Sequence, residues 1–117
     1  MTRKTESNQI LSRMEKEEIL SLAQKIWQNQ SKVATEIASE ALTIISEKYQ
    51  TDPTFFSGKS AKGILSGLFY LLGHRHDSTR TQREIAVSLN TTEVTLRASC
   101  REWAKPLQNH FGNRKTK

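Results

Sequence analysis

Hydrophobic residues recur along the chain at helical spacing, and no stretch alternates long enough to predict a β-strand. A first helix is expected from about Ser12, where a Ser-x-x-Glu pattern fits a helix start, to about residues 29–30. A second helix is expected from residue 31 and should stop at Thr51-Asp52-Pro53, because proline disfavours helix in the preceding residue. Its hydrophobic side consists of Val33, Ile37, Ala41, Ile44 and Ile45. The pattern predicts an all-α fold.

Residues 60–72 form the most hydrophobic segment, after a connecting loop at residues 55–58. Almost no polar side remains, so this helix should lie in the middle of the domain. Gly63 and Gly67 stand four apart and permit close contact with another helix. Residues 74–77 are expected to form a solvated basic loop. His74 and His76 give only weak evidence of a metal site, because no further ligand converges on them in the sequence.

The segment from Thr81 to Trp103 predicts two helices joined by a tight turn, the layout of a helix-turn-helix. Thr81 and Glu84 fit a capping box at the start of the first helix. Asn90 suits the turn because asparagine tolerates a positive φ, and residues 90–93 can cap the second helix.

The second helix of this pair has two distinct sides. At about 100° per residue, one narrow stripe carries Val94, Arg97, Arg101 and Lys105. The opposite side carries Leu96, Cys100, Trp103 and Leu107. One side can be buried while the other presents cations to a DNA groove, as a recognition helix requires.

Composition limits the alternatives. A chain of 117 residues with 35% hydrophobic content is enough for one small helical domain. We expect a flexible segment at residues 1–8, the domain at 9–109 with the helix-turn-helix at 81–107, and a basic tail at 110–117. The single cysteine, Cys100, excludes an internal disulfide and paired cysteine ligands for zinc, and is interpreted as a small core residue. Trp27 and Trp103 are expected as core anchors, with base stacking as the alternative.

The net charge of +6 is concentrated in the second half of the chain. Residues 1–57 hold seven Lys and Arg against eight Asp and Glu, whereas residues 58–117 hold eleven against four. The positive field therefore coincides with the predicted helix-turn-helix and could contact phosphates, although a solubilising surface explains charge alone equally well. No hydrophobic run approaches the ~20 residues of a membrane span, and the polar start lacks the core of a signal peptide, so a soluble intracellular protein is expected.

Residues 57–103 resemble the cyclin-box repeat of the general transcription initiation factor TFIIB and its archaeal counterpart TFB, and most of all the second of that family's two repeats. The residues that carry the resemblance are Ser57-Gly58-Lys59-Ser60, Tyr70, Thr81-Gln82-Arg83-Glu84-Ile85-Ala86 and Thr92-Glu93-Val94-Thr95-Leu96-Arg97. The resemblance implies a five-helix cyclin fold with a central third helix. It also implies location with the nucleoid in an archaeon or in the nucleus of a eukaryote.

In this family the second repeat binds DNA next to the TATA box, beside TATA-binding protein. The resemblance therefore implies promoter DNA and TATA-binding protein as partners, with RNA polymerase as a further one, and no cofactor. By motif match Val94 and Arg97 would contact bases. The expected contacts to the DNA backbone are Arg75, Arg80, Thr81, Gln82, Arg83, Thr92, Arg101 and Lys105, with Arg114, Lys115 and Lys117 of the tail also neutralising phosphates. Simple helix capping explains the threonines equally well.

The sequence also departs from the family. The full-length factor has a zinc ribbon and two repeats, whereas this chain lacks the ribbon cysteines and has room for one repeat. Leu89-Asn90 replaces the family's turn glycine, and Ala98-Ser99-Cys100 is smaller and less polar than usual. A change in base preference is therefore expected.

Three functions remain open at this stage. A TFIIB-type DNA-binding module is favoured. A cyclin-fold module that binds proteins without promoter-specific DNA binding is the alternative. An enzyme is poorly supported, because the sequence has no nucleophile motif, phosphate-binding glycine loop or metal-ligand spacing.

Overall fold

A computed structural model describes residues 16–115, with side chains through residue 108. Within this range the chain forms five α-helices and one 3-10 helix, and no strand. In order these are α2 (Lys16–Ile26), α3 (Ser31–Thr51), η1 (Pro53–Phe56), α4 (Ala61–Arg75), α5 (Gln82–Ser88) and α6 (Glu93–Lys115). The expected all-α, five-helix, cyclin-like fold is confirmed. The predicted start near Ser12, the segment 1–8 and Lys117 lie outside the described residues.

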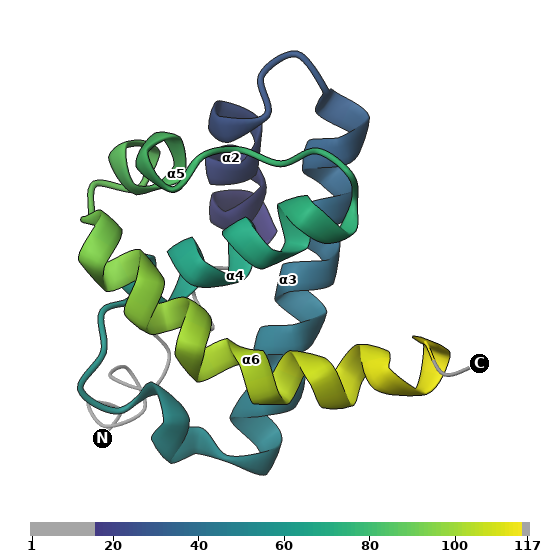
Figure 1. Cartoon of the computed structure of the whole chain (residues 1–117), viewed down its shortest axis with the longest axis vertical. Helices are drawn as coiled ribbons and strands as arrows, with labels where there is room; N and C mark the ends of the chain where they lie inside the picture. The colour runs from purple at the N-terminus through teal and green to yellow at the C-terminus, as the bar shows by residue number, and fades with distance from the viewer. Residues whose placement is uncertain (1–15, 116–117) are drawn as a thin grey trace.

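The first two helices form an antiparallel pair (Figure 1). α2 ends at Ile26, three residues before the predicted end, because residues 27–29 form a turn that closes with a hydrogen bond from Gln30 N to Trp27 O. α3 begins and ends where the sequence predicts, and Pro53 then starts η1. This 3-10 turn occupies part of the expected loop at residues 55–58.

Helix α4 runs through the middle of the molecule (Figure 1) and has its most extensive contacts with α6. Every residue from Gly63 to Phe69 is buried, as the sequence predicts for a central helix. A Cβ atom on Gly67 would lie 2.6 Å from the backbone nitrogen of Cys100. The glycine therefore allows the two helices to cross in direct contact, which confirms the role expected of it.

Hydrogen bonds fix this crossing. Ile64 O accepts one from Ser99 Oγ at 2.8 Å and one from Trp103 Nε1 at 3.0 Å. Trp103 is fully buried and lies against Phe55 of η1, with ring centroids 4.8 Å apart. Trp27 is equally buried and donates to Ser78 O at 2.7 Å. Both tryptophans are thus core anchors, and their burial leaves no ring free for base stacking.

The expectation of a basic loop at residues 74–77 is wrong at its start, because α4 continues through Arg75. Arg75 Nε lies 3.1 Å from Glu40 Oε2, and His76 Nε2 lies 2.7 Å from Glu40 Oε1. These contacts to α3 hold the last turn of α4 in place. The reversal follows only at Asp77, whose φ is 58°.

Helix α6 is also longer than the sequence predicts. It runs to Lys115 and so passes the expected domain boundary at residue 109. Pro106 lies inside the helix. Arg114 and Lys115 therefore lie on the last turn of a helix, although their side chains are outside the described part of the structure.

Candidate nucleic-acid interface

Two caps and a positive-φ turn build the helix-turn-helix formed by α5 and α6. The Thr81 hydroxyl accepts from Glu84 N, and the Glu84 carboxylate accepts from Thr81 N, each at 3.0 Å. Asn90 has a φ of 58° in the turn, as the sequence predicts. Thr92 Oγ1 then accepts from Thr95 N at 3.1 Å and caps α6. Each of the two helices is therefore capped at its N-terminus, and the turn at Asn90 joins the end of α5 to the start of α6.

The two sides of α6 separate as the sequence predicts. Leu96, Trp103 and Leu107 are buried, and Cys100 is half-buried. Val94, Arg97, Arg101 and Lys105 are exposed along the opposite side. Val94 is 69% exposed although hydrophobic residues of its size are usually covered, and Val87 of α5 is similarly exposed at 67%. A cationic helix with a hydrophobic residue near its N-terminus can fit a DNA major groove.

The Arg97 side chain connects the two helices of the motif. Its Nη1 donates to Gln82 Oε1 at 2.8 Å and lies 3.7 Å from Glu93 Oε1. Sequence reasoning placed Arg97 and Gln82 in the interface separately and missed this bond. Their separation of 15 residues carries no periodic signal, so only the docking of α5 on α6 reveals it.

The other residues that the sequence predicts to contact the DNA backbone fall into two groups. Arg83 is exposed on α5, and Thr81 and Thr92 are exposed while their hydroxyls cap the helices. Arg80 is directed into the fold, where it bonds Gln30 Oε1 at 3.0 Å.

Arg75 lies apart from this group. Its guanidinium pairs with Glu40 at the end of α4, which Figure 1 shows on the opposite side of the molecule from α5. The structure therefore does not bring Arg75 together with α5 and the exposed stripe of α6.

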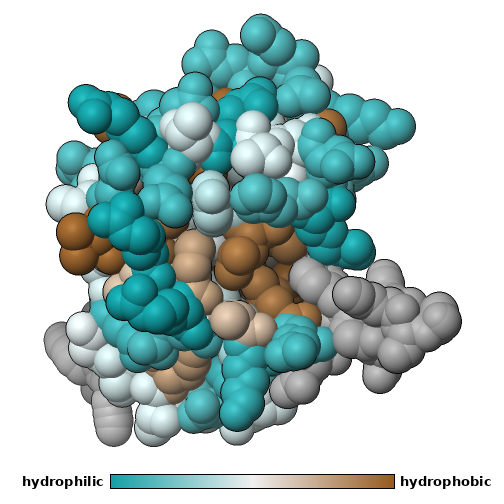
Figure 2. All heavy atoms as spheres, viewed as in Figure 1, coloured by the Kyte–Doolittle hydropathy of each residue, from teal (hydrophilic) through white to brown (hydrophobic). Residues whose placement is uncertain are grey.

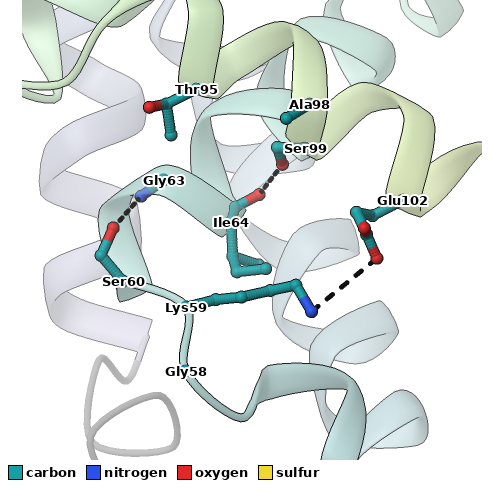
Figure 3. Close-up of a pocket in the computed structure, with 9 residues that line it drawn as sticks. All are labelled: Gly58, Lys59, Ser60, Gly63, Ile64, Thr95, Ala98, Ser99 and Glu102. Atoms are coloured by element: carbon teal, nitrogen blue, oxygen red, sulfur yellow. Dashed lines mark hydrogen bonds and ion pairs between the residues drawn. The ribbon is translucent and has the colours of Figure 1, made fainter.

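A cavity of about 340 Å³ lies between the start of α4 and the inner edge of α6 (Figure 3). Its lining includes Lys59, Ser60, Thr95 and Glu102. Lys59 Nζ donates to Phe55 O at 2.8 Å and lies 3.8 Å from Glu102 Oε1, so its charge is already partly balanced. Ser60 Oγ accepts from Gly63 N at 3.0 Å. The cavity is lined by polar and apolar residues alike, with one residue of each charge, in contrast to the cationic stripe.

Three other features that the sequence raised are the Cys100 thiol, metal ligands and membrane-spanning helices. Burial raises the pKa of the Cys100 thiol, which keeps it protonated, as expected of a small packing residue rather than a reactive thiol. Among residues 16–115 no group of three or more His, Cys, Asp or Glu is arranged to hold a metal ion. None of the helices in that range is long and apolar enough to cross a membrane.

Curated proteins from several archaea are similar to two thirds of this chain. It is 35% identical over 78 residues to transcription initiation factor IIB of Caldivirga maquilingensis and 32% identical over the same length to that of Pyrobaculum neutrophilum. Identity with transcription initiation factor IIB 1 of Thermococcus kodakarensis is 33% over 75 residues. The chain is related to archaeal transcription initiation factor IIB.

The relationship is partial. The matched region covers 67% of this chain but only 23% of the Caldivirga and Pyrobaculum factors, so the chain spans about a quarter of the relatives that it matches. No family model matches the chain, and no solved structure matches it significantly. The relatives are named as transcription initiation factors rather than as enzymes.

Proposed function

We propose that the chain is a DNA-binding module of the TFIIB type that contacts promoter DNA next to the TATA box, together with TATA-binding protein. The observation that carries the proposal is the exposed stripe of α6, which combines Val94 with Arg97, Arg101 and Lys105 on the helix that the resemblance assigns to base recognition. The similarity to archaeal transcription initiation factor IIB supports it. RNA polymerase is a further partner under this proposal.

The mechanism divides the interface into two parts. The N-terminal turns of α6 enter the major groove, where Val94 packs against a thymine methyl or base edge and Arg97 donates to a guanine. Arg101 and Lys105 lie further along the same side and neutralise phosphates, together with Arg83 of α5. Gln82, Thr81 and Thr92 lie at the helix ends nearby and add polar donors to the backbone. We leave Arg75 and Arg80 out of the interface because Arg75 lies away from α5 and Arg80 is directed into the fold.

The test is a titration of the full chain onto fluorescently labelled duplex DNA that carries an upstream element and a TATA box. Intact and scrambled upstream elements are compared at two salt concentrations, with and without an archaeal TATA-binding protein. We expect tighter binding to the intact element, further strengthening by TATA-binding protein, and a steep fall in affinity with salt. Binding that is indifferent to the upstream sequence and to TATA-binding protein contradicts the proposal.

A protein-interaction module is the second candidate. Figure 2 shows hydrophobic surface in the middle of one face, over the region where α3, α4 and α6 meet. Half-buried hydrophobic side chains on these helices include Leu42, Tyr70 and Leu71. If the titration shows no DNA binding at either salt concentration, these half-buried side chains become the residues to test, beginning with substitution of Leu71 by a charged residue.

A further inference from the structure

Arg97 is held in one orientation by two side chains from the N-termini of the two helices of the motif. Gln82 is the first residue of α5, and Glu93 is the first residue of α6. Their oxygens lie 2.8 Å and 3.7 Å from the same nitrogen, Arg97 Nη1. An arginine side chain that is 47% exposed would otherwise sample many rotamers.

Both holders are themselves fixed. The capping box of Thr81 and Glu84 sets the first turn of α5, which carries Gln82. The Thr92 cap sets the first turn of α6, which carries Glu93. Fully buried Ile85 and Leu96 lie three residues after Gln82 and one residue before Arg97, respectively. The two anchor points therefore cannot drift relative to each other without disturbing the core.

The contact also leaves useful donors free. Within the described residues no hydrogen bond forms from Nε or Nη2 of Arg97, and these two groups form one edge of the guanidinium fork. That edge can donate two parallel hydrogen bonds to the O6 and N7 acceptors of guanine. Because Gln82 accepts from Arg97 through Oε1, its Nε2 group remains a donor for a phosphate.

We propose that Gln82 is a positioning residue that orients Arg97 for guanine readout, and that it thereby determines sequence preference more than overall DNA affinity. This inference rests on the proposed function. It changes the role of Gln82 from a phosphate contact alone to a bridge between the DNA backbone and the base-reading arginine. Pre-organisation of this kind lowers the entropy that is lost when the arginine binds.

The experiment measures base discrimination in the presence of TATA-binding protein. Each guanine of the upstream element is replaced in turn by 7-deazaguanine, which removes the N7 acceptor. For the wild-type chain we expect one position to weaken binding roughly tenfold, and for Arg97→Ala we expect no loss there. Gln82→Ala should reduce this loss to about two- to threefold and, because a phosphate contact is also removed, weaken binding to scrambled DNA only slightly. The double variant Gln82→Ala/Arg97→Ala should discriminate no less than Arg97→Ala alone, because Gln82 acts on discrimination only through Arg97.

Two matched variants separate positioning from a phosphate contact. Gln82→Glu keeps an acceptor for Arg97, so we expect it to retain the discrimination while it binds all DNA more weakly. Arg83→Ala, at the adjacent exposed position, should weaken all DNA alike and leave the discrimination intact. In the free chain, ¹⁵N relaxation of Arg97 Nε should show greater mobility in Gln82→Ala but not in Arg83→Ala.

The outcomes are distinguishable. Discrimination by wild type that survives Gln82→Ala in full, whether or not affinity for all sequences falls, overturns the role of Gln82 and leaves the proposed function standing. Unchanged Arg97 mobility in Gln82→Ala overturns it as well. A wild-type chain that does not discriminate between any of the DNA sequences overturns both proposals.

Discussion

The four exposed residues of the α6 stripe have different chemistry and so should make different contributions to binding. Val94 and Arg97 lie on the first turn or two of α6, where a helix can approach base edges, whereas Lys105 lies more than two turns from Val94. A guanidinium fork recognises a base edge by geometry, but an ammonium group acts as a point charge that any phosphate satisfies. The same helix can therefore contain residues for specificity and residues for affinity.

Substitutions at Arg97 and Lys105 should separate these contributions. Arg97→Ala should cost about 1–3 kcal/mol on the intact upstream element and relax sequence preference. Lys105→Ala should weaken binding to intact and scrambled DNA alike and lower the salt slope by about 1. Anisotropy titrations at four salt concentrations measure both effects. If neither substitution alters DNA binding, α6 is not the recognition helix.

At the scale of the elements, the crossing of α4 and α6 positions α6, the helix that we propose for base recognition. Three features determine it: the missing side chain of Gly67, the bond from Ser99 to Ile64 O, and the burial of Trp103. Ser99 lies between Leu96 and Trp103 on the buried side of α6, so helical spacing could have identified it as a buried residue. Its polar character concealed that role in the sequence.

Gly67→Ala should therefore destabilise the fold by about 1–3 kcal/mol. The added Cβ would lie 2.6 Å from the backbone nitrogen of Cys100, which cannot move aside as a flexible side chain could. The cost of this clash should exceed the gain of roughly 1 kcal/mol that alanine has over glycine through its higher helix propensity. Urea unfolding measures the difference, with Lys62→Ala on the exposed side of α4 as the control, expected within about 0.5 kcal/mol of wild type. A Gly67→Ala chain as stable as the control would show that the helices can separate without cost.

The contact between Glu40 of α3 and the end of α4 should make the free energy of unfolding fall at acid pH. Burial raises the pKa of Glu40, but hydrogen bonds from His76 and Arg75 outweigh it and hold the pKa below its ordinary value of 4.5. A carboxyl with a depressed pKa in the folded state stabilises the fold above its unfolded pKa, and loses this contribution as pH falls through the folded pKa.

Glu40→Gln should therefore lower the free energy of unfolding by about 1 kcal/mol at neutral pH, with the gap to wild type closing as the pH falls below about 4.5. Urea unfolding at a series of pH values from neutral to 3 measures this gap. Glu18→Gln, at an exposed position on α2, should show a much smaller gap throughout. A gap for Glu40→Gln that stays constant down to pH 3 would mean that the ion pairs are not the cause.

At the scale of the whole molecule, charge is divided between the two halves of the fold. The exposed stripe of α6 and Arg83 of α5 are cationic, whereas α2 and α3 together carry five glutamates against four lysines. Such an asymmetry orients a protein as it approaches a polyanion and speeds association.

Two double charge reversals should test this orientation, because each lowers the net charge equally. Arg83→Glu/Arg101→Glu should reduce the salt slope of DNA binding by roughly 2, since about 0.9 counterions are released per neutralised phosphate. Lys25→Glu/Lys32→Glu, on α2 and α3, should leave the slope nearly unchanged. Equal effects of the two pairs would indicate a response to net charge rather than to one DNA-binding side.

The sequence by itself determined the helices, the caps at Thr81 and Thr92, the turn at Asn90 and the two sides of α6. These features arise from interactions within a few residues, so periodicity and residue type are enough to predict them. The tertiary structure decided the extension of α4 through Arg75, which depends on Glu40 some 35 residues earlier, and the hold of Gln82 on Arg97. Such contacts join residues that are far apart in the chain, and their existence depends on the angles at which whole helices cross, which no local pattern encodes.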